Sequence, residues 1–354
     1  MYSETDLTAA VAAGVLSADA AQALRDHAAG ARSTAFADEE HFRLITGFND
    51  IFVSIAAAIL IGAVAWIGEA IYTPLAGLFV AATAWGLSEY FTRVRRMALP
   101  SILLLLAFVG GVFASQIGVL VEHGEAWFGH NPDHQLIAVL GSAMALVSAG
   151  AAFAHWRRFM VPITVAAGTA ALVATVIGLI VAAIGPDNFT PNAILSLVLV
   201  GGVGVFGFAM NWDRSDRIRQ TRRSDVAFWL HLLAAPMIAH PLFTLLGVTE
   251  NDAISIGAAL GVIALYIVFA AVALAIDRRA LLVSALAYVL FAMTTLFREF
   301  GAVELNVALT ALVIGSALLL LSAFWQSARG TVLGLLPQSL RDLVPAPGLM
   351  AHSA

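Results

Sequence analysis

The sequence predicts an all-α membrane protein, a polytopic bundle of about ten transmembrane helices preceded by a short helical hairpin. Of its 354 residues, 60% are hydrophobic and only 12% are charged, and the mean hydropathy is +0.90. Soluble domains are about 45–50% apolar, so the bilayer is the expected solvent of this chain. The absence of Cys excludes disulfides, thiolate metal sites and Cys nucleophiles.

Residues 1–46 are polar enough to form a cytoplasmic domain of short helices. Helices are expected over 6–13 and 18–29, because Gly14 suits a left-handed helix stop and Ser17 can cap the second helix. An acidic run then favours a third helix start at 38–40, with an apolar face that can lie on the membrane surface.

The bundle is expected over residues 47–325, where ten segments approach the roughly 20 apolar residues that a helix needs to cross the hydrocarbon. Residues 326–354 are expected to form a tail along the cytoplasmic interface. The predicted spans are 49–67, 74–92, 98–121, 135–155, 159–185, 193–212, 225–247, 253–276, 280–298 and 303–325.

Alternate connections between these spans carry opposite charge. One set, 93–96, 157–158, 214–223 and 278–279, contains twelve Arg, whereas the other contains nine carboxylates and Arg298 alone. Arg-rich short loops stay in the cytoplasm. The sequence therefore predicts a multi-pass protein of the bacterial cytoplasmic (inner) membrane with both termini in the cytoplasm.

The N-terminal pattern LTAAVAAGVLSADAAQALRDH, followed by about ten spans, resembles the bacterial membrane proteins of the DUF2157 type. The resemblance is specific over about the first 30 residues and architectural afterwards. Because that family has no settled activity to carry over, it implies location and architecture but no functional residues.

The predicted span 225–247 carries the ionisable side chains placed deepest in the hydrocarbon, His231 and His240. Pro236 and Pro241 each remove a backbone donor and free the carbonyl four residues earlier, so a kink is expected. Nine residues separate the histidines, which places them about 180° apart on a helix. Each can relay protons or contact a substrate, or can simply bond a neighbouring helix.

Three carboxylates lie near the predicted cytoplasmic helix ends. Asp50 and Asp225 open spans, where the helix dipole favours a negative charge; Asp50 can alternatively line a cytoplasmic mouth. Glu89 stands four residues before Arg93, which favours a helical ion pair, with a buried proton-carrying carboxylate as the alternative.

The outer loop EHGEAWFGHNPDH offers imidazoles and carboxylates, which are suitable ligands for zinc or another divalent metal. The alternative is a solvated loop, since the spacing matches no known ligand pattern. No other cofactor is expected. The candidate ligands are His123, His130, Asp133 and His134.

The Arg cluster at 214–223 favours contact with anionic lipid over nucleic acid, because aspartates interrupt it and it joins two spans. The G-x-G-x-x-G pattern at 202–207 lies inside a span, so it indicates helix packing and no nucleotide site. A G-x-x-x-G pattern, Gly257 to Gly261, can serve packing within the bundle or a homo-oligomer.

No P-loop, Ser nucleophile elbow or H-E-x-x-H zinc helix occurs in the sequence. The leading hypothesis is transport of a small solute or ion, with protons as a candidate coupling ion, through a pathway along 225–247. Two five-span halves of opposite orientation would fit it. The alternatives are a non-catalytic scaffold or sensor acting through the N-terminal hairpin and, third, an intramembrane enzyme acting on lipid.

Overall fold

The computed structural model describes residues 10–24, 48–130, 132–217, 219, 221–247, 255–299 and 305–345. The chain divides into two compact units, Met1–Phe42 with Ala346–Ala354, and Arg43–Pro345. Throughout the described residues the regular structure is helical, without strands, which confirms the predicted all-α class.

The described part of the first unit is a helical turn at 10–12 and a helix at 18–24. Gly14 joins them with a φ of +70°, a left-handed conformation that glycine adopts without steric cost. The backbone N–H of Ala20 donates to Ser17 Oγ at 3.1 Å, as expected of an N-cap. Residues 6–9 of the first predicted helix, residues 25–29 of the second and the predicted helix start at 38–40 lie outside the described residues.

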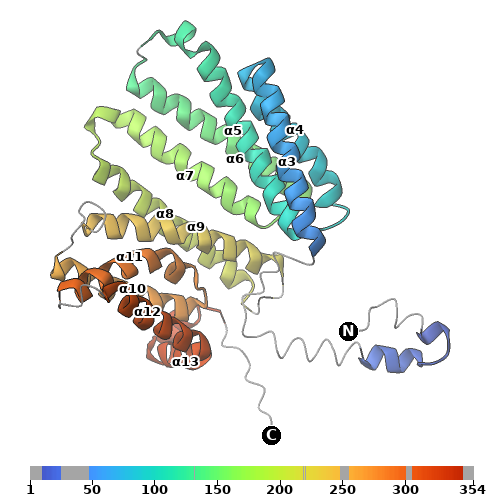
Figure 1. Ribbon diagram of the computed structural model, residues 1–354, viewed down its shortest axis with the longest axis vertical. Helices are drawn as coiled ribbons and strands as arrows, with labels where there is room; N and C mark the ends of the chain where they lie inside the picture. The colour runs from blue at the N-terminus through green and yellow to red at the C-terminus, as the bar shows by residue number, and fades with distance from the viewer. Residues whose placement is uncertain are drawn as a thin grey trace. The chain divides into compact units, whose positions relative to one another are not determined.

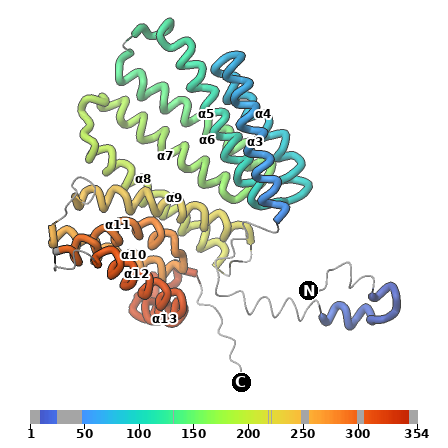
Figure 2. Tube along the Cα trace, in the orientation of Figure 1, coloured from blue at the N-terminus to red at the C-terminus, as the bar shows by residue number. Residues whose placement is uncertain are grey.

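The second unit is a succession of helices that follow one another in space largely in chain order (Figure 1; Figure 2). The helices are α3 (Phe48–Ile71), α4 (Thr73–Phe91), α5 (Ala98–Phe128), α6 (His134–Phe159), α7 (Ile163–Ile184), α8 (Pro191–Ser215), α9 (Arg222–Leu245), α10 (Ile256–Ile276), α11 (Ala280–Glu299), α12 (Asn306–Ala323), α13 (Trp325–Leu335) and α14 (Gln338–Arg341), with a short 3₁₀ turn η1 (Pro186–Asn188) before α8.

Nine of the described helices are long and apolar enough to cross a membrane, namely α3 and α5 to α12. The tenth predicted span, 74–92, is also a helix, α4, but its 19 residues include Thr73, Ser88 and Glu89 and it falls short of the apolarity of the other nine. It packs against both α3 and α5. The chain is therefore a polytopic helical membrane protein.

Glycines allow α4 and α5 to approach closely. A Cβ on Gly77 would lie 2.1 Å from the backbone nitrogen of Ser115, and one on Gly111 would lie 2.7 Å from that of Ala81. Distances below 3.0 Å leave no room for a side chain. This close backbone contact, built on small residues, secures the less apolar helix within the bundle.

The glycine patterns behave differently from one another. Gly202 lies against Met237 of α9, with 2.8 Å from its added Cβ to Met237 Cβ, whereas Gly204 and Gly207 face open space. Gly261 also meets nothing within 4 Å. The 202–207 pattern thus contributes one packing contact. A Cβ on Gly257 would meet only Ser255 Oγ, at 3.9 Å, among the described residues, so the use of Gly257 and Gly261 in a homo-oligomer stays a prediction.

The helix α9 is the most enclosed of the nine candidate spans among the described residues, with 50% of its apolar window buried. It contacts α7, α8 and α11. Thr221 caps it by accepting from the backbone N–H of Arg223 at 3.3 Å. Despite the internal Pro236 and Pro241, the helix is continuous, so the span that carries both candidate histidines is also the centre of packing.

The described part of the tail packs against the bundle. The helix α13 contacts α10, and Val344 and Leu333 lie in one apolar cluster with Ile276. Residues up to Pro345 accordingly belong to the same compact unit as the spans, a closer association than the interfacial tail predicted for 326–354.

Candidate functional site

A buried ionic cluster joins three segments where α8 ends, α9 begins and α10 turns into α11. Asp213 in the last turn of α8 is 1% exposed. Its Oδ2 lies 2.9 Å from Nε2 of His231, and its Oδ1 accepts a hydrogen bond of 2.7 Å from Nη2 of Arg278. We call these three residues the Asp213 cluster.

Local backbone geometry brings Arg278 into this cluster. Asp277 ends α10 in a left-handed conformation, with a φ of 57°, and this reverses the chain direction. Arg278 then also donates to the carbonyl of Ser224 at 3.1 Å, and its guanidinium lies 5.9 Å from the ring centroid of Phe228. Both α9 and the α10–α11 turn are thereby tied to the end of α8.

A second set of polar contacts surrounds Asp277. Its Oδ2 accepts from Nη1 of Arg219 at 2.8 Å, and its Oδ1 accepts from the indole N–H of Trp325 at 2.7 Å. Arg329 of α13 lies 3.9 Å from the same carboxylate and donates to the carbonyl of Leu274 at 3.2 Å. We call Asp277, Arg219, Trp325 and Arg329 the Asp277 network.

The two groups together hold more positive than negative charge. Arg219, Arg278 and Arg329 are three cations, and Asp213 and Asp277 are two anions, which leaves one positive charge in excess when His231 is neutral. Burial and then the positive charge of Arg278 lower the pKa of Arg219, which lies in the α8–α9 loop. Arginine nevertheless stays protonated, because its ordinary pKa is above about 12.

His231 has one nitrogen that the cluster does not use. A carboxylate only accepts hydrogen bonds, so Nε2 carries the proton that points to Asp213, and neutral His231 has its lone pair on Nδ1. Nδ1 is buried without a hydrogen-bond partner among the described residues. The Phe206 ring packs edge-on against the imidazole, with 5.2 Å between ring centroids. The site can therefore accept a proton at Nδ1 while the contact with Asp213 persists.

His240 lies in a different environment from His231. It is exposed, and its Nδ1 is 2.6 Å from the hydroxyl of Tyr288 on α11. Pro236 is exposed and Pro241 is buried. The structure does not bring the two histidines together, in agreement with their predicted opposite faces.

The three predicted carboxylates lie on three different helices, α3, α4 and α9. Asp50 is 3% exposed in the first turn of α3. Asp225 is exposed in the first turn of α9, where Thr221 is the N-cap. Glu89 bonds Arg93 at 3.3 Å, as predicted, and also makes a two-pronged ion pair with Arg158 of α6 at 2.7 and 2.9 Å.

The candidate metal ligands of the outer loop pair with separate partners. His123 contacts the hydroxyl of Tyr72, and Asp133 caps α6 by accepting from the N–H of Gln135 at 3.0 Å. The remaining candidate ligands each contact one carboxylate, with 2.7 Å from His130 Nε2 to Glu125 Oε1 and 3.0 Å from His134 Nδ1 to Asp187 Oδ1. Within the described part of the chain, no group of three or more His, Cys, Asp or Glu is placed to hold a metal ion.

Sequence reasoning found His231 but missed the residues around it. Asp213 and Arg278 belong to connections that the charge pattern explains as topology signals, and Trp325 fits the usual place of Trp at a span end. The available signal for Asp213 was a carboxylate at the end of a predicted span, directly before an Arg-rich connection.

Comparison of the chain with protein-family models, curated proteins and solved structures finds no match. The fold and its composition therefore define the class, an integral multi-pass helical membrane protein that contacts the lipid bilayer.

Proposed function

We propose that this protein moves a small solute or ion across the membrane and that proton binding at His231 is coupled to the movement. The observation that carries the proposal is the Asp213 cluster, in which three ionisable side chains from three segments meet with little exposure. Ionisable groups inside a membrane bundle are costly, and they commonly mark ion pathways or proton relays.

Protonation of His231 changes the charge balance of this cluster. With neutral His231, Asp213 and Arg278 cancel; with protonated His231, two cations share one carboxylate. In a poorly solvated site the extra charge is strongly felt. The two protonation states thus favour different arrangements of α8, α9 and the α10–α11 turn.

The described conformation is a closed one for His231, which is 2% exposed. A carrier must expose its site to each side in turn. Pro236 and Pro241 supply a place to bend within α9, because each leaves a carbonyl without its helical donor. The proposal therefore requires a second conformation in which α9 opens the cluster to water.

The orientation and location follow from charge. We propose that the ends bearing the Arg-rich connections 93–96, 157–158, 214–223 and 278–279, here called the Arg-rich end, face the cytoplasm of a bacterial cell. The Asp213 cluster and the Asp277 network then lie on the cytoplasmic side.

Proton movement in proteoliposomes tests the function. Vesicles containing the full chain and a trapped pH-sensitive dye are given monocarboxylates, amino acids, sugars, Na⁺, K⁺ or phosphate in turn. We expect at least one probe to drive proton movement, and His231→Gln to abolish that coupling, because Gln cannot take up the proton.

The matched control is His155→Gln. His155 is also fully buried, but it lies among aromatic rings and faces Thr164 Oγ1 at 3.3 Å, outside the Asp213 cluster. Coupling that survives in His231→Gln, or is lost equally in both variants, contradicts the role of His231. Failure of every probe to move protons in the wild type contradicts the transport function.

The division of the chain into two units favours one alternative. Met1–Phe42 belongs to a unit separate from the bundle, as a partner-binding hairpin would. Deletion of residues 1–37 separates the two ideas, because a scaffold or sensor loses its partner whereas a transporter keeps its flux. The lipid-acting enzyme gains no support, since Glu89 is engaged by arginines and Asp225 is exposed.

A further inference from the structure

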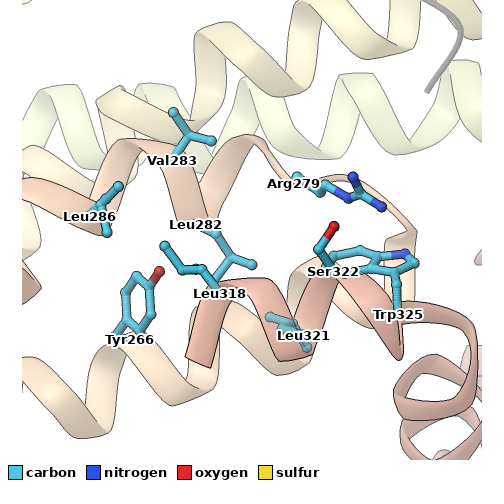
Figure 3. Close-up of a pocket in the computed structure, with 9 residues that line it drawn as sticks. All are labelled: Tyr266, Arg279, Leu282, Val283, Leu286, Leu318, Leu321, Ser322 and Trp325. Carbon is cyan, nitrogen blue, oxygen red and sulfur yellow. The ribbon is translucent and has the colours of Figure 1, made fainter. Parts of the chain in front are cut away.

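A cavity of about 120 Å³ lies between α10, α11 and α12, beside the Asp277 network (Figure 3). Neither His231 nor His240 lines it, so it is distinct from the candidate proton site. Its lining consists of Tyr266, Arg279, Leu282, Val283, Leu286, Leu318, Leu321, Ser322 and Trp325.

The lining is polar at one end and apolar along its length. Figure 3 shows Arg279, Ser322 and Trp325 grouped at one end, with leucines between them and Tyr266. Among the described residues that line the cavity there is one cation and no carboxylate. This is the arrangement that an amphiphile with an anionic head and an apolar tail requires.

The polar end is held in place before any ligand arrives. The guanidinium of Arg279 lies over the Trp325 ring, 4.7 Å from its centroid. Trp325 is only 4% exposed, and its indole N–H is anchored on Asp277 at 2.7 Å. The Asp277 network therefore fixes the wall against which Arg279 rests, and a preformed site loses little entropy on binding.

The cavity also lies at the right depth and opens on the right surface. Arg279 directly precedes α11 and Trp325 begins α13, so both lie at the Arg-rich end, the level of lipid headgroups. Val283 on its rim is 66% exposed on a helix that spans the membrane. Basic pockets between spans are a recognised type of anionic lipid site.

We infer that this cavity binds an anionic phospholipid. The phosphate contacts Arg279 and the hydroxyl of Ser322, and one acyl chain lies along Leu282, Leu286 and Leu318. The volume equals about four water molecules, so only a segment of the chain enters and the rest lies on the exposed faces of the helices.

The Tyr266 hydroxyl distinguishes a lipid from a small polar ligand. It is buried without a hydrogen-bond partner among the described residues and lies at the opposite end from Arg279 (Figure 3). An acyl chain needs no donor there, so Tyr266→Phe leaves lipid affinity unchanged. A polar ligand that bonds this hydroxyl would bind Tyr266→Phe more weakly.

Native mass spectrometry of the full chain in detergent tests the inference. Phosphatidylglycerol, phosphatidylcholine with the same chains, and soluble glycerol 3-phosphate are added separately. We expect one retained phosphatidylglycerol that neither comparison molecule replaces. Arg279→Gln lowers its affinity about tenfold or more, as the loss of a charge-assisted hydrogen bond predicts, and Leu318→Phe lowers it by filling the cavity.

Arg157→Gln is the matched control. Arg157 also lies at the Arg-rich end with its guanidinium over a ring, 5.9 Å from the Phe153 centroid, but it does not line the cavity. If Arg279→Gln, Arg157→Gln and the wild type retain phosphatidylglycerol equally, the lipid is general annular lipid and the proposed site is wrong. Equal binding of phosphatidylcholine, competition by glycerol 3-phosphate, or loss of binding in Tyr266→Phe overturns the anionic lipid as the occupant.

A change in folding does not obscure these results. Leu286→Phe fills the same cavity from another helix, and each variant is compared only if its thermal unfolding midpoint in detergent matches the wild type. The lipid site is independent of the proposed transport, because it shares neither residues nor readout with His231.

Discussion

Replacing Asp213 by Asn tests whether the Asp213 cluster stabilises the fold as one ionic unit. Asp213 is the only carboxylate that the described contacts place on Arg278, which is 4% exposed. After the substitution the Arg278 guanidinium keeps its 3.1 Å hydrogen bond to the Ser224 carbonyl but loses the negative charge that neutralises it. Removing one partner of a buried pair costs about 3–5 kcal/mol of unfolding free energy, and we expect a loss of that size.

A double-mutant cycle separates the interaction energy between Asp213 and Arg278 from the other effects of each substitution. Arg278→Met removes the other charge with a side chain of similar length, and the double variant leaves no unpaired ion. Because replacing both members of a buried pair is often neutral, the double variant should recover most of the loss. Residues in direct contact typically show interaction energies of about 0.5–3 kcal/mol, and because each single substitution leaves a buried charge without its partner, we expect a value at or above the top of that range. Unfolding in mixed detergent and SDS measures each corner of the cycle.

The exposed pair of Glu89 and Arg158 provides the comparison. Glu89→Gln removes a pair of similar length, 2.7 Å, but with side chains 33% and 41% exposed. Solvent screens such pairs, which are typically worth about 0–1 kcal/mol, so we expect Glu89→Gln to lower the unfolding free energy far less than Asp213→Asn does. An additive cycle at Asp213 and Arg278, or equal losses for Asp213→Asn and Glu89→Gln, would refute the assignment of a buried ionic unit.

Two further predictions concern packing. Gly111→Ala should lower the unfolding free energy by about 1–3 kcal/mol by overpacking α4 against α5, whereas Gly110→Ala, which meets nothing within 4 Å, should not; equal effects would contradict the close contact with Ala81. His155→Phe should change the unfolding free energy by less than about 1.5 kcal/mol. This histidine lies among aromatic rings, and its Nε2 already lacks a partner in the described structure. Thermal unfolding in detergent measures both, and a large loss in His155→Phe would indicate a polar role for that residue.

The spans could be predicted because a membrane helix depends on local composition. A run of about 20 apolar residues satisfies its own backbone hydrogen bonds within one segment. Among the described helices at the ten predicted spans, only α4 falls short of this apolarity, and glycines bring it into close contact with α5. The resemblance to the DUF2157 type stays a prediction.

The candidate site could be predicted only in part, because its contacts depend on which helix ends meet. Glu89 and Arg93 are four residues apart, and that ion pair was predicted. Asp213 lies 18 residues from His231 and 65 from Arg278, and no pattern in one sequence specifies pairing at such separations. The Arg-rich loops illustrate the difficulty, since their charge pattern predicts a topology signal throughout, yet Arg278 is a buried partner of Asp213.

Side-chain direction limited the prediction further. His231 and His240 look alike in the sequence, yet one is buried beside Asp213 and the other is exposed beside Tyr288. Helical spacing correctly placed them on opposite faces. Which face meets α8 depends on the packing of the whole bundle, and that information is not local.

Opening of the closed site is the central requirement of the proposed function, and thiol accessibility tests it most directly. The chain has no cysteine, so Ala235→Cys introduces a single thiol one turn beyond His231 at a fully buried position, and Ala84→Cys does the same on α4. In membrane vesicles under a proton gradient, we predict that a charged thiol reagent labels position 235 faster than position 84. Labelling at 235 that stays as slow as at 84 under every gradient and solute would contradict the account.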